Sequence, residues 1–495
     1  MFLRTITIKG ITRLYFYESY YENGKTRQKC VENLGRLDEL QIKYDDPVLH
    51  FKKIAEERTI EKKAAQKISV PIDIDAEMDV NEDNLKNAGY SVLKELYKQL
   101  ELDKFWKRKL RNTSIKYDLE AVFRLLVFSR ILYPASKLET FHAKDVYFEK
   151  IDGFSEKDVY KALDLFDKYN DELQKWIYDH SSKICTRDMS VSYFDCTNYY
   201  FDIGRSDMDT FDDDGNPIDK KGNPTEPKYR KRGPEKNHRP DPIVEMGLLM
   251  DKNGIPLAFD LFPGNESEKV HMRPIINRVK NEFNNGRIIF VADRGLNTSD
   301  NIYFLNGDNK GDYNPRDGYV YGQSVRGADA EFKAWVLGDG YQTDKLKDED
   351  GKEIIFTHKS RIYPKTIHVN LTIPGQKKKK KKDVSIDQKQ MVYYSEKYAK
   401  KQKHDRDIMI ARATDLIAHP KKYDRITAAG SGAYVQNIAF DKTTGEIVEG
   451  RELTLDIKKI AEEEKYDGYY SVVTSELNMS DYEIRDTYRG LARIE

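Results

Sequence analysis

Residues 191–197 read VSYFDCT, a short apolar stretch that carries one acid, Asp195, near its centre. Its aromatic and β-branched residues indicate a strand. Residues 243–250 and 255–262 indicate two more strands, because the sequence Asp-Lys-Asn-Gly at 251–254 is typical of a hairpin turn. Together the three segments predict an antiparallel meander with Asp195 on its first strand.

A helix-like segment, residues 268–284, leads from the meander into RIIFVAD at residues 287–293. The second segment indicates a buried strand that ends on an acid, Asp293. A helix between two strands of one sheet is normally a right-handed crossover, which lets the two strands lie parallel. We therefore expect the strand that ends at Asp293 to lie parallel to a strand of the meander.

The last segment of the chain indicates a strand at 469–474 and then a helix that begins at a capping box on Ser480. Helical spacing places Glu495 on the apolar stripe of this helix, together with Ile484 and Tyr488. A carboxylate that points inward is costly unless it is paired or bound to a metal. The position of Glu495 therefore suggests a metal site or an ion pair.

Three acids, Asp195, Asp293 and Glu495, are thus predicted to converge on one sheet. Converging carboxylates repel one another unless cations hold them. Mg²⁺ and Mn²⁺ prefer oxygen ligands, and two such ions about 3.5–4 Å apart promote phosphoryl transfer. Each acid also has a simpler interpretation: Asp195 pairs with an arginine, Asp293 is a turn residue, and Glu495 faces solvent. The order of strands and helices favours the metal site.

The remaining segments predict a multidomain α/β protein. The expected divisions are a small antiparallel β domain (1–55), a polar linker (56–90), a helical region (91–185), the first part of a mixed-sheet domain (186–330), a β-rich insertion (331–465), and a final strand with an acidic helix (466–495). The insertion carries a charged helix, residues 395–416, and six consecutive lysines, Lys377–Lys382. Two helices around Pro134 form either a helix-turn-helix that binds DNA ends or an ordinary packed pair.

Composition restricts the class of protein. Lys+Arg and Asp+Glu number 84 each, so net charge identifies no partner, although 34% of the residues are charged against about 25% in ordinary domains. Three cysteines without a CxxC pair fit a reducing cytoplasm and argue against a structural zinc site. No apolar run approaches the ~18 residues that span a membrane. The chain is expected to be cytoplasmic and to bind no membrane.

Several of these segments resemble the insertion-sequence transposases of the DDE class. The resemblance rests on SYFDCTNYYF around Asp195, GLLMDKNGIPLAFDLFPGNESE at 247–268, VADRGLNTSDN around Asp293, YDGYYSVVTSE with the later Tyr488 and Glu495, and ENLGRLDEL at 32–40. It implies a ribonuclease-H-like catalytic domain interrupted by a β-rich insertion, with Asp195, Asp293 and Glu495 as catalytic residues and ligands of magnesium. The family's acidic helix continues past its glutamate, whereas this sequence stops at Glu495, so the resemblance implies a truncated final helix.

A DNA-cleaving enzyme must neutralise phosphates, and six basic residues form a dense loop between the first two strands of the meander. They are Lys228, Arg230, Lys231, Arg232, Lys236 and Arg239. These residues either bind a DNA end near Asp195 or form a solvated loop. Arg294, which follows Asp293, and Tyr488 are predicted to contact DNA as well.

The sequence therefore predicts a transposase that cleaves the ends of a DNA element and joins them to target DNA. It is expected to act as a homodimer on double-stranded DNA, with two Mg²⁺ or Mn²⁺ ions. Two alternatives remain open: a metal-dependent nuclease that cuts without joining, and a catalytically inactive DNA-binding remnant. Joined products would exclude the first alternative, and metal-dependent turnover would exclude the second.

Overall fold

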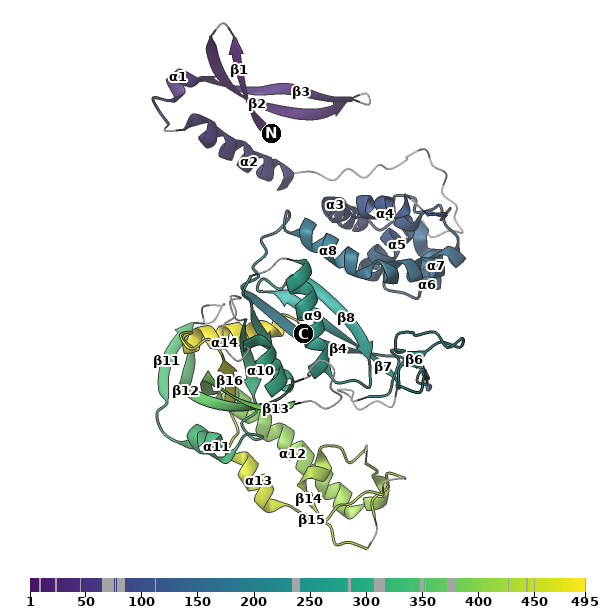
Figure 1. Cartoon of the computed structure of the whole chain (residues 1–495), viewed down its shortest axis with the longest axis vertical. Coiled ribbons are helices and arrows are strands. Elements are labelled where there is room, and N and C mark those ends of the chain that lie inside the picture. Colours follow the sequence, from purple (N-terminus) through teal and green to yellow (C-terminus); the bar gives the residue numbers. More distant parts are fainter. Residues whose placement is uncertain are drawn as a thin grey trace. The chain divides into compact units, whose positions relative to one another are not determined.

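The computed structural model describes residues 1–494 apart from 9, 23–24, 45, 65–74, 76, 78–84, 112, 234–240, 284–285, 307–316, 348–350, 352, 372–379, 426, 442–443 and 449. The chain divides into two compact units, Met1–Asp167 and Lys168–Glu495. Its described residues form both helices and strands, and the largest sheet is mixed (Figure 1). The predicted α/β class is therefore confirmed in its coarse form.

An antiparallel sheet begins the first unit. In the described part its strands β1 (Phe2–Ile8), β2 (Ile11–Glu22) and β3 (Lys25–Arg36) pair in that order, as the alternating sequence predicts. Helices α1 (Leu37–Leu40) and α2 (Pro47–Ala64) follow. The buried ring of Phe16 packs against Phe51 of α2, with 6.2 Å between ring centroids. Because α2 extends to Ala64, residues 56–64 of the expected linker are helical.

Helices form the rest of the described first unit, as the sequence predicts. They are α3 (Tyr90–Gln99), α4 (Leu102–Leu110), α5 (Leu119–Leu132), α6 (Lys137–His142) and α7 (Glu156–Lys168). The ring centroid of the buried Trp106 lies 4.9 Å from that of Phe123 and 5.1 Å from that of Phe166. This aromatic cluster joins α4, α5 and α7 into one packed group.

Among the described residues, nine strands form the large mixed sheet of the second unit, in the order β11-β12-β13-β16-β10-β9-β4-β7-β8. They are β4 (Val191–Tyr200), β7 (Ile243–Asp251), β8 (Pro256–Pro263), β9 (Ile289–Ala292), β10 (Gly318–Gln323), β11 (Gln342–Lys347), β12 (Glu353–Leu371), β13 (Lys380–Tyr394) and β16 (Tyr469–Thr474). The predicted meander is confirmed, because β4, β7 and β8 pair antiparallel. The predicted parallel pairing is confirmed as well, because β9 lies parallel to β4. Strand β10 continues the parallel part of the sheet beside β9.

Helices cover both faces of this sheet. On one face α8 (Asn170–Ser181), α9 (Glu268–Glu282) and α10 (Ser299–Asn306) pack over a core that includes Phe194 and Phe290. On the other face α14 (Asp481–Arg489) packs against Tyr193 and Val291, and a 3-10 turn, Gly490–Arg493, continues it. The predicted apolar stripe of the last helix therefore meets the sheet.

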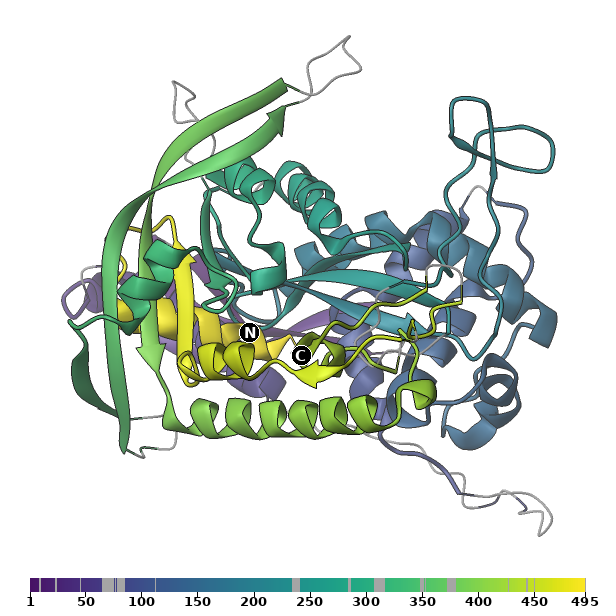
Figure 2. The same ribbon diagram turned by 90° about the horizontal axis from the view of Figure 1, so that it is seen from below.

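The segment between β10 and β16 adds three strands, β11, β12 and β13, to the sheet. Strands β12 and β13 run side by side as a long hairpin (Figure 2). The predicted charged helix is confirmed as α12 (Glu396–Ala418), whose N-cap Ser395 accepts a hydrogen bond from the backbone of Tyr398. Of the six lysines, 380–382 lie in β13 and 377–379 lie outside the described residues.

Short elements complete the described fold. They are α11 (Ala330–Leu337), α13 (Ile457–Glu464), the strand pair β5 (Thr210–Phe211) and β6 (Pro217–Ile218), and the strand pair β14 (Val435–Gln436) and β15 (Thr454–Leu455). Four 3-10 turns of the described chain, Ala143–Val146, Arg294–Leu296, Pro420–Lys422 and Ser431–Tyr434, connect other elements. Within the described residues, every helix is too short or too polar to cross a lipid bilayer.

Candidate active site

Asp195 and Asp293 occupy matching positions on neighbouring parallel strands. The pairing of β4 with β9 aligns Phe194 with Ala292. Asp195 is the next residue of β4, and Asp293 directly follows the last residue of β9 in an extended conformation. Phe194 and Ala292 belong to the core under α9. Because side chains alternate between the faces of a strand, the acids that follow them point to the opposite face, which α14 covers. Adjacent strands lie about 4.8 Å apart, so the two carboxylates are close neighbours.

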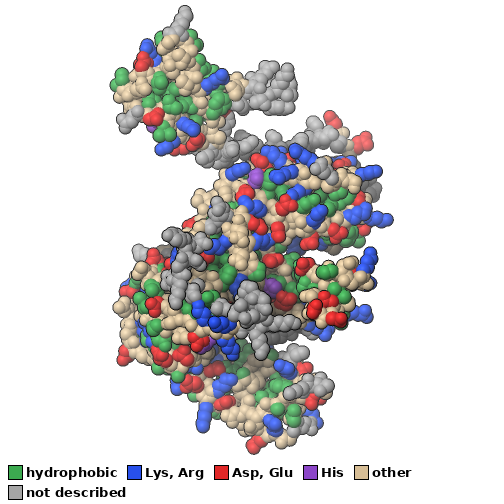
Figure 3. Space-filling model, viewed as in Figure 1, with side chains coloured by type: hydrophobic (Ala, Val, Ile, Leu, Met, Phe, Trp, Pro, Cys, Tyr) green, Lys and Arg blue, Asp and Glu red, His purple; other side chains and the backbone are tan. Residues whose placement is uncertain are grey.

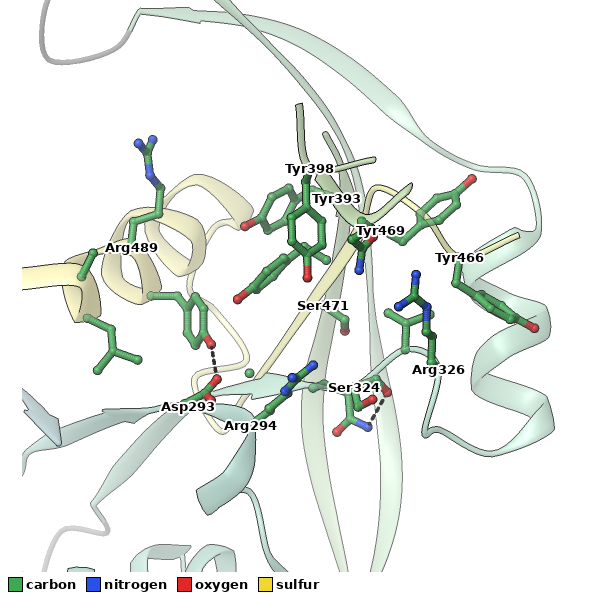
Figure 4. A pocket seen from close by; sticks show the side chains of 18 of the residues that line it. Asp293, Arg294, Ser324, Arg326, Tyr393, Tyr398, Tyr466, Tyr469, Ser471 and Arg489 are labelled. Carbon is green, nitrogen blue, oxygen red and sulfur yellow. Dashed lines mark hydrogen bonds between the residues drawn. The ribbon is translucent and has the colours of Figure 1, made fainter. Parts of the chain in front are cut away.

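One cavity of about 600 Å³ lies beside both acids (Figure 4). Asp195 is half-buried at its edge and Asp293 is exposed to it. Arg294 and Tyr488, which the sequence predicts as DNA contacts, line the same cavity. The fold thus brings four of the predicted site residues together.

A hydrogen bond from α14 holds Asp293. The hydroxyl of Tyr488 donates to Oδ1 of Asp293 over 3.2 Å. Burial raises the pKa of Tyr488, and the neighbouring Tyr470 and Asp293 raise it further, so the hydroxyl remains a donor at neutral pH. The approach requires a glycine at position 322, because a Cβ on Gly322 would lie 2.5 Å from Oη of Tyr488.

The two ends of α14 are fixed by local features. Ser480 and Glu483 form the predicted capping box, in which each side chain accepts a hydrogen bond from the other residue's backbone N–H. At the far end Gly490 lies directly against the ring of Tyr193 in β4, and a Cβ at this position would overlap the Tyr193 hydroxyl. Both features set the position of Tyr488 along the sheet.

A partly buried charged cluster also ties α14 to β12 and β13. Lys389 of β13 pairs with Asp481 of α14 at 3.0 Å. His358 of β12 is buried between two carboxylates, with Nδ1 at 2.7 Å from Asp481 and Nε2 at 3.0 Å from Asp344. The helix that carries Tyr488 is therefore held from two strands of the inserted segment.

Tyrosines form much of the remaining cavity wall. Apart from Tyr488, the described tyrosines that line the cavity are Tyr393, Tyr398, Tyr466, Tyr469 and Tyr470. Figure 4 shows Tyr393 and Tyr398 across the cavity from Arg294. The Tyr470 centroid lies 5.5 Å from Tyr393 and 5.1 Å from Tyr398. No motif in the sequence predicts that these tyrosines line a cavity. The one sequence pattern that could have indicated it is the alternation along β16, which puts Tyr470 on the same face as the buried Val472.

Three arginines of the described residues face the cavity. Arg326 pairs with Asp467 at 2.6 Å. Arg294 and Arg489 are exposed and form no ion pair within the described part of the chain. The cavity wall therefore carries two arginines that no described acid neutralises; Arg294 directly follows Asp293, whereas the Arg489 side chain points away from Asp293 (Figure 4).

The predicted basic loop carries its own counter-charges. Arg230 pairs with Asp207 at 2.7 Å, and Lys231 pairs with Asp209 at 2.6 Å. Hydrogen bonds from Arg230 hold the pKa of Asp207 below its usual range, so this pair is ionised at neutral pH. Lys228 and Arg232 are exposed and donate to the carbonyls of Met208 and Gly204. Acidic and basic side chains are interspersed on the visible surface in the same way (Figure 3).

Three predicted site residues, Lys236, Arg239 and Glu495, lie outside the described residues. Within the described ranges, no group of three or more His, Cys, Asp or Glu side chains converges to hold a metal ion. The described part of the cavity supplies two carboxylates, Asp195 and Asp293.

Comparison with known proteins identifies one segment of the chain. Residues 3–67, which include β1 to β3 and both following helices, match the family model of the IS1634 family transposase, N-terminal domain. No curated protein matches the chain.

Two solved structures give weak matches. One is a Mos1 transposase paired-end complex with the left transposon end, at 12% identity over 43% of this chain and 69% of that chain, with a TM-score of 0.13. The other is the crystal structure of the Mos1 mariner paired-end complex with Mn, at 11% identity over the same shares, 43% and 69%, with a TM-score of 0.12. TM-scores this low establish no shared fold.

The family model confirms the resemblance that the sequence predicts: the chain is similar to the insertion-sequence transposases, and its residues 3–67 are similar to the N-terminal domain of the IS1634 family.

Proposed function

We propose that the protein is a DDE transposase, which cleaves the ends of a DNA element and joins them to target DNA. The observation that carries the proposal is the placement of Asp195 and Asp293 at matching positions of two parallel strands, beside one cavity. The match of residues 3–67 to a transposase domain supports the same reading.

The order of strands supports a ribonuclease-H-like catalytic core. Strands β8, β7 and β4 pair antiparallel, and β9 and β10 follow parallel to β4. The helix α9 connects β8 to β9, and the first acid lies on β4. The resemblance to DDE transposases implies this arrangement, with the inserted strands adding to one edge of it.

The donor groups fit a hard divalent cation. Asp195 and Asp293 offer carboxylate oxygens, which Mg²⁺ and Mn²⁺ prefer as ligands. Two carboxylates on adjacent strands also repel each other, and a bound cation relieves that repulsion. Asp195 and Asp293, with Glu495 as the third expected ligand, would hold the ions, which stabilise the negative charge that develops on the reacting phosphate.

The protein's own groups orient the acids and the DNA. Tyr488 holds one carboxylate oxygen of Asp293 and so fixes the orientation of that side chain. Arg294 and Arg489 present guanidinium groups that suit phosphate oxygens on either side of the scissile bond. The tyrosine wall supplies apolar surface for the sugars and bases next to that bond.

The proposed reaction has two balanced steps. In cleavage, the oxygen of a water molecule forms a bond to phosphorus while the bond from phosphorus to the 3′ oxygen breaks, and the 3′ oxygen takes up a proton. In joining, the freed 3′-hydroxyl oxygen forms a bond to a target phosphorus while the target's own 3′ oxygen leaves. One phosphodiester replaces another in the second step, so it needs no nucleotide cofactor. Two ends take part in such a reaction, and a homodimer is the expected assembly.

Cleavage of duplexes that carry the DNA flanking the coding sequence tests this proposal. Asp195→Asn and Asp293→Asn should each slow Mg²⁺-dependent cleavage by at least about a hundredfold, because each removes a ligand charge. Both variants should keep their affinity for the duplex. Asp387→Asn, which changes an exposed acid on β13 of the same sheet, is the matched control and should cleave normally.

Unchanged cleavage by both variants would contradict the proposed site. Cut products that are never joined, even with target DNA present, would instead favour the nuclease. Duplex binding without metal-dependent turnover by the unmodified chain would favour the inactive DNA-binding protein.

A further inference from the structure

The sheet β1–β3 has one covered face. Leu14 and Phe16 of β2 are fully buried on it. Arg58 of α2 lies over the Phe16 ring, 5.1 Å from its centroid, and pairs with Glu32 of β3 at 2.6 Å. Helix α2 therefore covers the face to which Leu14, Phe16 and Glu32 point.

The opposite face, called the open face below, carries exposed arginines and partly exposed aromatic rings among the described residues. Strand pairing aligns Phe2 with Tyr17 and Arg4 with Tyr15, and places these residues on the open face together with Arg13. The ring centroid of Tyr17 lies 6.2 Å from that of Phe2 and 6.4 Å from that of Tyr15. The rings thus form a continuous patch in the middle of this face.

Among the described residues of these strands, glutamates and arginines lie on opposite faces. Glu18 and Glu32 share the register of Phe16 and so belong to the covered face, whereas Arg4 and Arg13 belong to the open face. Arg4 donates to Gln28, and neither Arg4 nor Arg13 has an acidic partner among the described residues. The open face is therefore cationic, even though the whole chain has a net charge of zero.

We propose that this open face binds double-stranded DNA. The inference rests on the proposed function, which requires the protein to hold duplex ends, and it names the surface that does so. Three strands at about 4.8 Å spacing present a surface about 10 Å wide, which fits a major groove about 12 Å wide. Sheets are known to enter that groove and read it with side chains of one face.

The packing of the rings favours a duplex over a single strand. Single-stranded nucleic acids bind by stacking bases on aromatic ring faces. The guanidinium of Arg4 already lies over the Tyr17 ring, 5.1 Å from its centroid, and Tyr15 meets Tyr17 edge to face, with 77° between the ring planes. The ring faces are thus partly occupied, while Arg4 and Arg13 are exposed and accessible to phosphates and base edges.

A native thiol reports on this face. Cys30 of β3 is exposed and aligned with Tyr17, whereas Cys185 lies in the second unit. In the unmodified full chain, a saturating 30-bp duplex of mixed sequence should slow maleimide alkylation of Cys30 by about tenfold, because access controls thiol reactivity. Alkylation of Cys185 provides the internal comparison and should change little. An unchanged rate at Cys30 with the duplex fully bound would overturn the inference.

Charge removal gives an independent measurement. Arg4→Gln/Arg13→Gln should lower the slope of log affinity against log salt by about two, since each phosphate contact contributes about 0.9. Lys52→Gln/Lys53→Gln removes the same charge from exposed positions of α2 and should leave the slope nearly unchanged. An equal change of the salt slope in the double arginine variant and the double lysine variant would overturn the inference. Tighter binding of single-stranded DNA or RNA than of the duplex would overturn it as well.

The outcomes separate this inference from the proposed function. If DNA leaves Cys30 unprotected while Asp195→Asn still abolishes cleavage, the open face is not the DNA-binding surface, but the proposed transposase function is retained. If Cys30 is protected but the unmodified chain never cleaves DNA, the open face binds DNA and the proposed catalytic function is refuted. The alkylation experiment uses the unmodified chain, so it decides the question even if the arginine variant does not fold.

Discussion

Tyr488 of α14 and Asp293 at the end of β9 are 195 residues apart in the sequence and are joined by a hydrogen bond of 3.2 Å. The bond connects the last described helix to the strand that carries the second acid. Burial raises the pKa of Tyr488, so its hydroxyl is a donor throughout the neutral range. One oxygen of Asp293 is therefore held in place, and the other is left for a ligand.

Tyr488→Phe is expected to weaken Mg²⁺ binding without unfolding the protein. Loss of a hydrogen bond to a metal ligand typically costs about 10- to 100-fold in metal affinity or activity. A titration of cleavage rate against Mg²⁺ concentration should therefore show a higher half-saturating concentration. Tyr363→Phe removes an exposed hydroxyl that bonds Glu331 and should behave like the unmodified protein. Identical titration curves for Tyr488→Phe and the unmodified chain would show that the bond has no such role.

Gly490→Ala is expected to destabilise the second unit. A Cβ at this position overlaps the buried Tyr193 hydroxyl, and overpacking of this kind costs about 1–3 kcal/mol. Urea unfolding should show the loss, and Tyr193→Phe in the same chain should recover part of it. Gly204→Ala, where a Cβ meets no atom within 4 Å, is the control. Equal stability of the two alanine variants would refute the close packing of Gly490 on Tyr193.

Asp481 is expected to make the stability of the second unit depend on pH. Burial alone would raise the pKa of its carboxyl, but hydrogen bonds from Lys389, Ser360 and His358 outweigh burial and bring the pKa below 3.8. A carboxyl whose pKa is lower in the folded state stabilises the fold above its unfolded pKa and loses that effect as the pH falls through the folded pKa.

Asp481→Asn should therefore lower the free energy of unfolding by about 3 kcal/mol at pH 7, the usual cost of breaking a buried ion pair. The difference from the unmodified chain should shrink as the pH falls below 3.8. Asp486→Asn changes an acid on the same helix whose side chain is 69% exposed, and it should have little effect at either pH. A difference that stays constant down to pH 3 would contradict the expected linkage.

Asp207→Asn/Asp209→Asn is expected to strengthen non-specific binding to duplex DNA. These acids neutralise Arg230 and Lys231, and their removal leaves two free cations on an exposed loop. Each new phosphate contact should add about 0.9 to the salt slope. Binding measured by fluorescence anisotropy at several salt concentrations checks this, with Asp213→Asn/Asp214→Asn as the charge-matched control on exposed neighbours. A loss of affinity in the first pair would mean that the ion pairs shape the loop for binding.

The core of the second unit can be predicted because its signals are local. The meander follows from alternation and a hairpin turn, and β9 follows from an apolar run after the segment that forms α9. The parallel pairing then brings Asp195 and Asp293 together without any knowledge of the intervening loop. The capping box at Ser480 is equally local, and it defines where α14 begins.

Strand β12, which pairs with β13 beside the cavity wall, could not be predicted, because its pairings are not local. Strand β12 contains Pro364 and the buried Lys359, which are unusual in a sheet interior. Lys359 is tolerated because its ammonium donates to the carbonyls of Trp335, Gly338 and Asp339, where α11 ends. These contacts of the Lys359 ammonium with backbone carbonyls appear only in the folded chain.

The ion pairs of the basic loop could not be predicted from the sequence either. In the sequence, Asp207 precedes the β5–β6 strand pair and Arg230 follows it. Nothing in their spacing indicates that the two side chains form an ion pair. A cluster of bases and a cluster of acids in one sequence is compatible with two separate surfaces or with one set of ion pairs. The folded loop selects the second possibility for Arg230 and Lys231.

The pairing of β4 with β9 leaves the length of chain between the two acids unconstrained. Insertions or deletions between β4 and β7, for example in residues 201–230, which lie outside the nine paired strands, would change the interval from Asp195 to Asp293 without moving either side chain. Homologues can therefore differ widely in that interval and keep the same chemistry. A search for distant homologues should look for two acids that each follow an aligned pair on adjacent parallel strands, and should place no limit on the number of residues between them.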